Sequence, residues 1–213
     1  MKTPREKTVD ILRILSKEYP DAKAELNFSN PFETLIATML SAQCTDKRVN
    51  EVTKVLFNIA PDPESMAKLS VEELECIIKP CGLYHAKARH ILDVCHEINE
   101  VYGGIVPGDK AKLTALPGVG GKTASVVLME AFGADMLPVD THVFRLAHRI
   151  DLVETAKTPD ETQRQLEAIT PKGERRHMHH LLILHGRRCC KAIKPDCEHC
   201  PLINRVCVFE RKA

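Results

Sequence analysis

A glycine-rich stretch at residues 116–123 restricts the fold more than any other feature; it reads Leu-Pro-Gly-Val-Gly-Gly-Lys-Thr. A phosphate-binding P-loop has a glycine, four further residues and then Gly-Lys-Ser/Thr, and it follows a β-strand. Here the first glycine would have to stand at Leu116, and no alternating strand pattern precedes that position. The P-loop fold is therefore excluded, and the stretch is interpreted as a tight turn between two helices.

The spacing of apolar residues predicts helices through almost the whole chain. Apolar residues recur every three or four positions, and no run alternates with the period of two that a strand needs. In the first helix we expect Val9, Leu12 and Leu15 to face the core. Ser70 and Glu73 form the pattern of a capping box. The predicted fold class is all-α, with helices at residues 8–19, 31–40, 49–59, from 70 onward, 84–101, 121–132, 141–150, 158–169 and 176–185.

The charge distribution bears on possible partners. The chain has 30 basic and 29 acidic residues, so its net charge of +1 gives no general sign of nucleic-acid binding. Residues 172–194, however, hold seven Lys or Arg against one acidic residue, Glu174. Such a local surface can follow a phosphate backbone or can simply be solvated, and charge alone leaves both open. The charged start of the chain and the absence of a long apolar run predict an intracellular protein without a membrane partner.

The glycine turn also suggests chemistry. Gly118 and Gly120 allow a positive φ and a close approach of a ligand. The helix that follows begins with unpaired N–H groups at the positive end of its dipole, which suits a phosphate, although an ordinary turn is the alternative. Lys122 lies in the first turn, where the dipole and any partial burial disfavour its ammonium. The free amine can attack carbon, and contact with a phosphate is an equally good interpretation.

The cysteines are concentrated near the C-terminus. Nine is an odd number, and an intracellular chain keeps its thiols reduced, so no disulfide framework is expected. Cys190, Cys197, Cys200 and Cys207 follow the spacing x6, x2, x6. Four thiolates suit zinc or a four-iron cluster, and the spacing leaves both open. Because neighbours on a helix point about 100° apart, only one of Cys189 and Cys190 is expected to face the metal. The histidines at 177–185 are interpreted as packing residues or phosphate contacts.

Several motifs together resemble one known family. Residues 116–128 are similar to the helix–hairpin–helix of the endonuclease III family of DNA glycosylases. Residues 139–145, Val-Asp-Thr-His-Val-Phe-Arg, resemble its downstream segment, and Leu40–Asp46 and Gly82–Tyr84 resemble two more. The C-terminal cysteines resemble its metal cluster, although the last spacing is x6 where the family commonly has x5. The resemblance extends over essentially the whole chain.

The resemblance implies an enzyme of base-excision repair. It would remove oxidised pyrimidines from duplex DNA and cut the abasic strand on the 3′ side by β-elimination. Lys122 would be the nucleophile that forms a Schiff base with the sugar, and Asp140 would be the carboxylate that assists it. Judged by its position alone, ahead of the helix at 141, Asp140 is better interpreted as an N-cap.

The resemblance also implies DNA contacts and a cofactor. Gln43 would fill the space left by an extruded base and Leu83 would be a wedge beside it, although sequence alone also allows a surface amide and a core leucine. Cys190, Cys197, Cys200 and Cys207 would hold a structural [4Fe–4S] cluster. We expect a monomer of the cytoplasm or nucleoid that acts on damaged or abasic double-stranded DNA. The other expected DNA-contacting residues are Gly118, Val119, Gly120 and Lys191.

Two helical lobes are implied as well. Residues 24–134, with the helix–hairpin–helix at about 109–132, would form one lobe, and residues 1–23 with 135–213 would form the iron–sulfur lobe. The adenine-mismatch branch of the superfamily lacks the lysine and has an extra C-terminal domain, whereas this chain has Lys122 and ends six residues after Cys207. A non-catalytic helix–hairpin–helix module is the alternative from another class. The combination of Lys122, Asp140 and the cysteines counts against it.

Overall fold

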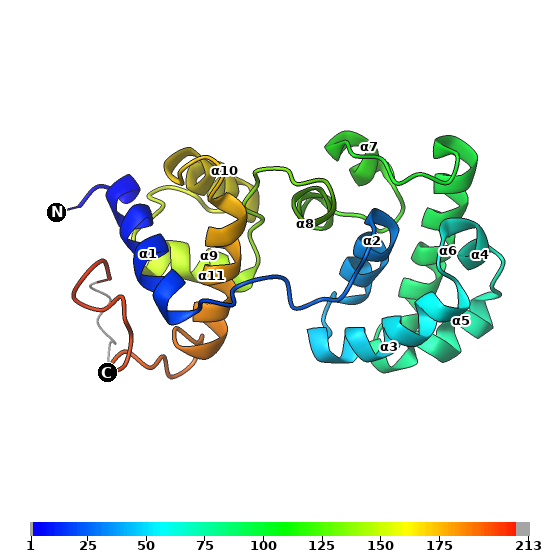
Figure 1. Ribbon diagram of the computed structural model, residues 1–213, viewed down its shortest axis with the longest axis horizontal. Helices are drawn as coiled ribbons and strands as arrows, with labels where there is room; N and C mark the ends of the chain where they lie inside the picture. The colour runs from blue at the N-terminus through cyan, green and yellow to red at the C-terminus, as the bar shows by residue number, and fades with distance from the viewer. Residues whose placement is uncertain (1, 208–213) are drawn as a thin grey trace. The chain divides into compact units, whose positions relative to one another are not determined.

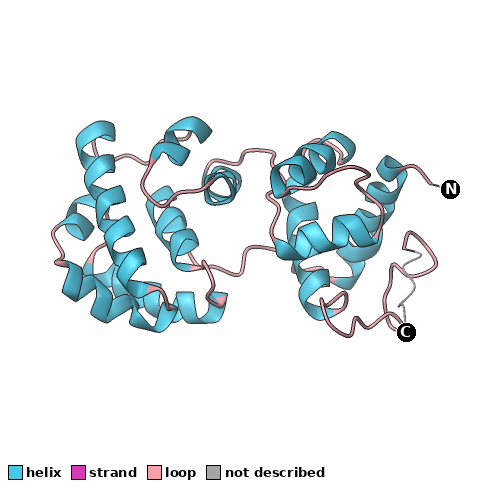
Figure 2. Ribbon diagram, turned by 180° about the vertical axis from the view of Figure 1, so that it is seen from behind, coloured by secondary structure: helices cyan, strands magenta, loops and turns pink. Residues whose placement is uncertain are grey.

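The computed structural model describes residues 2–207 and is all-α (Figure 1). Among these residues no β-strand forms (Figure 2). The one extended pairing in the described range is an isolated bridge between Ile203 and Cys207. No helix in the described range is long and apolar enough to cross a membrane. The predicted fold class is therefore confirmed. The helices are α1 (Pro4–Glu18), α2 (Pro31–Leu40), α3 (Asp46–Ile59), α4 (Pro63–Ala67), α5 (Val71–Ile78), the 3-10 helix η1 (Lys79–Cys81), α6 (Tyr84–Tyr102), α7 (Lys110–Ala115), α8 (Gly121–Ala131), α9 (Thr141–Arg149), α10 (Pro159–Ile169) and α11 (Arg175–Arg188).

The chain divides into two compact units, residues 24–134 and residues 1–23 with 135–213, of which residue 1 and residues 208–213 lie outside the described range. In the first unit α2 is buried on every side, since all seven residues from Thr34 to Leu40 are buried. The capping box predicted at Ser70 is present, because its side chain accepts from the Glu73 N–H and the Glu73 side chain accepts from the Ser70 N–H. Sequence analysis missed α4, where Asp62 is the N-cap and Pro63 the first helical residue. An Asp-Pro pair that follows one helix can thus begin the next.

The second unit consists of α1, α9, α10, α11 and the C-terminal cysteine loop. The apolar face predicted for α1 is partly wrong: Val9 is 50% exposed, whereas Ile11, Ile14 and Leu15 are buried. The buried face is the one that meets α10 and α11, and Thr8 on that face donates a hydrogen bond to the Ile169 carbonyl. Helical spacing alone permits either face, and tertiary packing decides between them.

The turn between α7 and α8 has the tight geometry predicted for it. Gly118 has φ +71°, and a Cβ there would come within 2.7 Å of the His90 ring. Val119 is buried and its N–H donates to the Leu116 carbonyl. The positive φ expected at Gly120 is wrong, because Gly120 is the N-cap of α8 and has the extended backbone of that position, φ −83° and ψ 170°. Of these two glycines, therefore, only Gly118 has the left-handed backbone conformation that requires glycine.

Replacing each glycine by alanine should separate the two positions. Gly118→Ala should lower the free energy of unfolding by more than about 2 kcal/mol, because a left-handed residue with a Cβ costs about 1–2 kcal/mol and that Cβ would also lie within 2.7 Å of the His90 ring. Gly120→Ala should cost about 1 kcal/mol or less, because glycine is only a somewhat better N-cap than alanine. Urea denaturation of both variants measures this difference. An equal loss at the two positions would contradict the assignment of the strained residue to Gly118.

Candidate active site and metal centre

Lys122 is the second residue of α8, and its side chain is exposed. The partial burial considered for this side chain is therefore absent. The N-cap, Gly120, provides no side-chain hydrogen bond to the first turn. Because no side chain caps the first turn, its N–H groups can bind an anion. This helix end, in the unit of residues 24–134, thus combines a place for a phosphate with an accessible amine.

Asp140 is the N-cap of α9 in the other unit. Its Oδ1 accepts a hydrogen bond of 2.8 Å from the Val143 N–H, so the capping role judged from position is confirmed. In the described residues no hydrogen bond is made by Oδ2 of this half-buried carboxylate. The guanidinium of Arg145, one turn along α9, interacts with the charge of Asp140. One oxygen of Asp140 thus stabilises the helix, and the other is available for chemistry.

Gln43 and Leu83 share an unusual backbone conformation. Both have a left-handed φ, 54° for Gln43 and 50° for Leu83, and both are exposed. Leu83 is 57% exposed, so the interpretation of it as a core residue is wrong. For residues with a Cβ such a conformation costs about 1–2 kcal/mol each, and strain of this kind is often found at functional sites.

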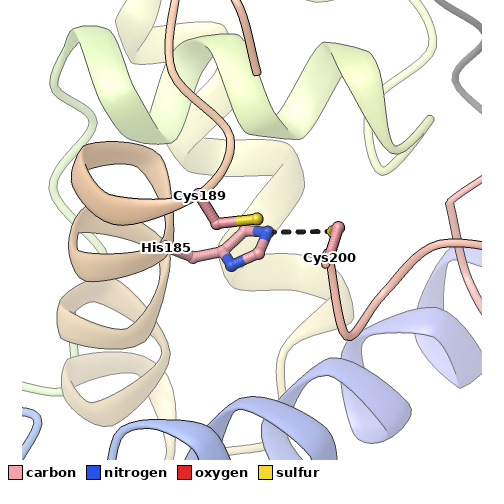
Figure 3. A group of neighbouring side chains, drawn as sticks. All are labelled: His185, Cys189 and Cys200. Carbon is pink, nitrogen blue, oxygen red and sulfur yellow. Dashed lines mark hydrogen bonds between the residues drawn. The ribbon is translucent and has the colours of Figure 1, made fainter. Parts of the chain in front are cut away.

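The C-terminal cysteines lie around one small cavity, part of which is open to solvent. All four predicted ligands contribute to its wall. In Figure 3, which labels His185, Cys189 and Cys200, Nε2 of the imidazole points toward Cys200, whose sulfur lies 3.6 Å away, and the Cys189 sulfur lies beside it. The ligand atoms of the three residues are all within 4.8 Å of one another. The complete cysteine lining is Cys189, Cys190, Cys197, Cys200 and Cys207.

Cys189 and Cys190 both line the cavity, so the expectation that only one of them faces the metal stays a prediction. Helix α11 ends at Arg188, so the helical angle between neighbours does not apply at these positions. The Cys189 thiol belongs to the group with His185 and Cys200. The Cys190 sulfur instead accepts a hydrogen bond of 3.5 Å from the Arg149 guanidinium.

Of the two interpretations of the histidines of α11, the structure supports packing. His179, His180 and His185 are buried, and the ring of His177 hydrogen-bonds Ser16 at 2.8 Å. They are packing residues, because the helix turns their side chains toward the core. The basic side chains around them differ: six of the seven Lys and Arg in residues 172–194 are exposed, and the half-buried one is Arg175.

Comparison with known proteins identifies the family. Residues 36–172 match the HhH-GPD superfamily base excision DNA repair protein family. The chain is 43% identical over 208 residues to endonuclease III of Escherichia coli strain K12, covering 98% of each protein. The chain belongs to the endonuclease III family. Two solved structures, a trapped endonuclease III–DNA covalent intermediate and a non-covalent endonuclease III–DNA complex, each match this member of the family with a TM-score of 0.91 and 43% identity, over 98% of this chain and 97% of theirs.

In this endonuclease III family member the chemistry of the cavity fits a metal site. Thiolate sulfur suits zinc and iron–sulfur clusters, and five thiols line one cavity. Burial lowers the pKa of His185 to about 4, so its imidazole is uncharged at neutral pH. The Tyr19 hydroxyl lies 3.2 Å from Nδ1 of that imidazole and fixes the orientation of the ring. A compact cluster of soft sulfur donors beside a neutral imidazole is an environment that suits a metal cation.

Two substitutions of Asp140 should separate its capping role from its charge. Asp140→Ala should lower the free energy of unfolding by about 1 kcal/mol through loss of the cap, whereas Asp140→Asn should preserve it because asparagine caps as well as aspartate. Thermal denaturation of the two variants checks this. If Asp140→Asn is destabilised as much as Asp140→Ala, the negative charge and not the hydrogen bond stabilises α9.

Proposed function

We propose that this chain is a DNA glycosylase and abasic-site lyase of base-excision repair. It removes oxidised pyrimidines from duplex DNA and cleaves the strand on the 3′ side of the lesion, with Lys122 as the nucleophile. The observation that supports this most is the accessible amine of Lys122 on an uncapped helix N-terminus, in a chain 43% identical to an endonuclease III. A relative of that identity forms a covalent intermediate with DNA that can be trapped.

The chemistry begins at the sugar. The Lys122 amine forms a bond to C1′ while the glycosidic bond breaks, and the base leaves with the electron pair of that bond and a proton. Opening of the sugar ring gives a protonated imine, which acidifies the C2′ hydrogens. Loss of one C2′ proton then expels the 3′ phosphate and cleaves the strand. The Asp140 oxygen that does not cap α9 is the candidate to assist the amine and to stabilise positive charge on the sugar as the base leaves.

DNA binding is assigned to three kinds of surface. The backbone of Gly118, Val119 and Gly120 and the first turn of α8 would hold one phosphate, without preference for a base. Lys191 is exposed, as are most basic residues of 172–194, and these would follow the phosphate backbone. Gln43 and Leu83 are exposed and would fill and wedge open the stack when the damaged base is extruded.

We assign the cavity in the C-terminal loop to a [4Fe–4S] cluster held by Cys190, Cys197, Cys200 and Cys207. The spacing x6, x2, x6 has only one of the two close pairs that are usual for zinc, and the four thiols line one cavity. When bound, the cluster would cross-link the loop and so order Lys191 for contact with DNA. Arg149 supports this loop directly, because its guanidinium donates to the carbonyls of Lys191 and Ala192 at 2.7 and 3.0 Å.

Borohydride trapping tests the proposed nucleophile. Purified protein should form a covalent adduct with duplexes that carry thymine glycol or an abasic site, and much less with those that carry uracil or 8-oxoguanine. Lys122→Ala should abolish trapping while binding to DNA persists, because only the amine is lost. Lys112→Ala, which removes an exposed lysine from α7, is the matched control and should still be trapped. Equal trapping by Lys122→Ala would exclude this residue as the nucleophile, and no trapping by the unmodified protein would favour a non-catalytic DNA-binding module.

Metal analysis tests the cluster and its ligands. The purified protein should be brown and contain about four irons per chain, as a [4Fe–4S] cluster requires. Cys190→Ser should lose or destabilise the cluster, whereas Cys189→Ser should retain it. Absorbance and iron content of the two variants measure this. Bleaching by Cys189→Ser alone would move the first ligand to Cys189, and a protein with zinc and no iron would overturn the cluster assignment.

A further inference from the structure

Lys87 is a buried lysine to which the proposed function gives no role. It lies in the first turn of α6, is only 7% exposed, and stands in the apolar face that continues through Ile91 and Ile98. Burying an ammonium is costly unless its donors are satisfied. Here its Nζ donates three hydrogen bonds, to the carbonyls of Leu40, Ala42 and Cys81 at 2.8, 2.8 and 3.0 Å. An ammonium has three donors, so all of them are used.

The three acceptors come from two loops that are about forty residues apart in the sequence. Leu40 and Ala42 belong to the end of α2 and the turn that leads into Gln43, and Cys81 ends η1 two residues before Leu83. The ammonium therefore joins the backbone beside Gln43 to the backbone beside Leu83. Both of these residues have a left-handed backbone, and Gly82 between Cys81 and Leu83 also has a positive φ of 67°.

The three hydrogen bonds of the Lys87 ammonium do something that core packing alone would not require. An apolar side chain of similar length would fill the same space without an ammonium to desolvate, but it could not bind three carbonyls. Strained residues persist only where the surroundings over-determine them, and Lys87 binds the carbonyl of the residue before Gln43 and that of the second residue before Leu83. The bond to each loop is charge-assisted, which makes it stronger than an ordinary hydrogen bond.

We propose that Lys87 is a positioning residue for base extrusion: its ammonium fixes the two loops relative to each other, so that Gln43 and Leu83 enter the DNA stack as one unit. This inference rests on the proposed function of those two residues. A paired lesion must be extruded before its base can be removed, whereas an abasic site has no base to extrude. Loss of Lys87 should therefore slow base removal from a paired lesion much more than cleavage at an abasic site.

The experiment compares two single-turnover rates at saturating enzyme, kept under reducing conditions because the Cys44 and Cys81 thiols contact each other. The substrates are a duplex with paired thymine glycol, read as released base, and the same duplex with an abasic site, read as strand cleavage. Lys87→Met should slow the first reaction by about tenfold or more, the size expected when charged hydrogen bonds are lost, and leave the second within about twofold. The control is Lys68→Met, which removes a surface lysine paired with Glu64 in the same unit and should leave both rates within about twofold.

A double-mutant cycle tests whether Lys87 acts through the two loop residues. In a Gln43→Ala, Leu83→Ala background, Lys87→Met should cause little further loss of base removal, because the side chains that it positions are already absent. Equal slowing of both reactions by Lys87→Met, or full additivity in the cycle, would overturn the proposal and leave Lys87 a structural residue. If Lys87→Met does not fold, Lys87→Gln keeps two N–H donors without the charge, and the same selective loss is expected in milder form. Absence of both reactions in the unmodified protein would instead refute the proposed function, and this inference with it.

Discussion

The backbone groups that helices leave unpaired at their ends are the constraint on which the candidate functional regions depend. In the unit of residues 24–134, the carbonyls where α2 and η1 end are bound by the buried ammonium of Lys87. The opposite kind of end, the N-terminus of α8, has no side-chain cap. The carbonyls at the ends of α2 and η1 are thus satisfied by a buried charge. The N–H groups at the start of α8 remain available to a ligand, and Lys122 lies beside them.

The same constraint organises the cysteine loop of the other unit. Arg145 donates to the carbonyls of Gly186 and Cys190, and Arg149 donates to the next two carbonyls along the chain. These bonds continue the pairing of carbonyls past the end of α11, where the helix itself can no longer provide donors. Since Arg145 and Arg149 both lie on α9, the helix capped by Asp140 also supports the wall of the metal cavity. Stability of that helix therefore affects both the carboxylate and the metal site.

Periodicity and local motifs predict the fold well, and they fail where tertiary contacts decide. The helical pattern, the cap at Ser70 and the grouping of the cysteines depend on neighbours in sequence, so they could be predicted. The buried face of α1 and the conformation of Gly120 depend on which elements pack together. Lys87 left one signal in the sequence, a lysine in the apolar stripe that includes Ile91. Its acceptors lie in loops distant in the sequence, so only the structure could show what the lysine binds.

The conformation of Leu83 and Gln43 is itself an argument for function. A turn that only needed a left-handed residue would be more stable with glycine, by about 1 kcal/mol or more at each position. An apolar side chain that only needed burial would not be 57% exposed, as Leu83 is. Leu83 has both the unfavourable backbone and the unfavourable exposure, and Gln43 on the neighbouring loop also has the unfavourable backbone. The chain adds a third cost by burying the ammonium of Lys87 to hold the two loops together. Left-handed backbones, an exposed leucine and a buried ammonium are each unfavourable for folding, and all three occur around one pair of exposed side chains. This combination is difficult to explain by folding alone. It is expected if those side chains must enter a second molecule in a fixed geometry.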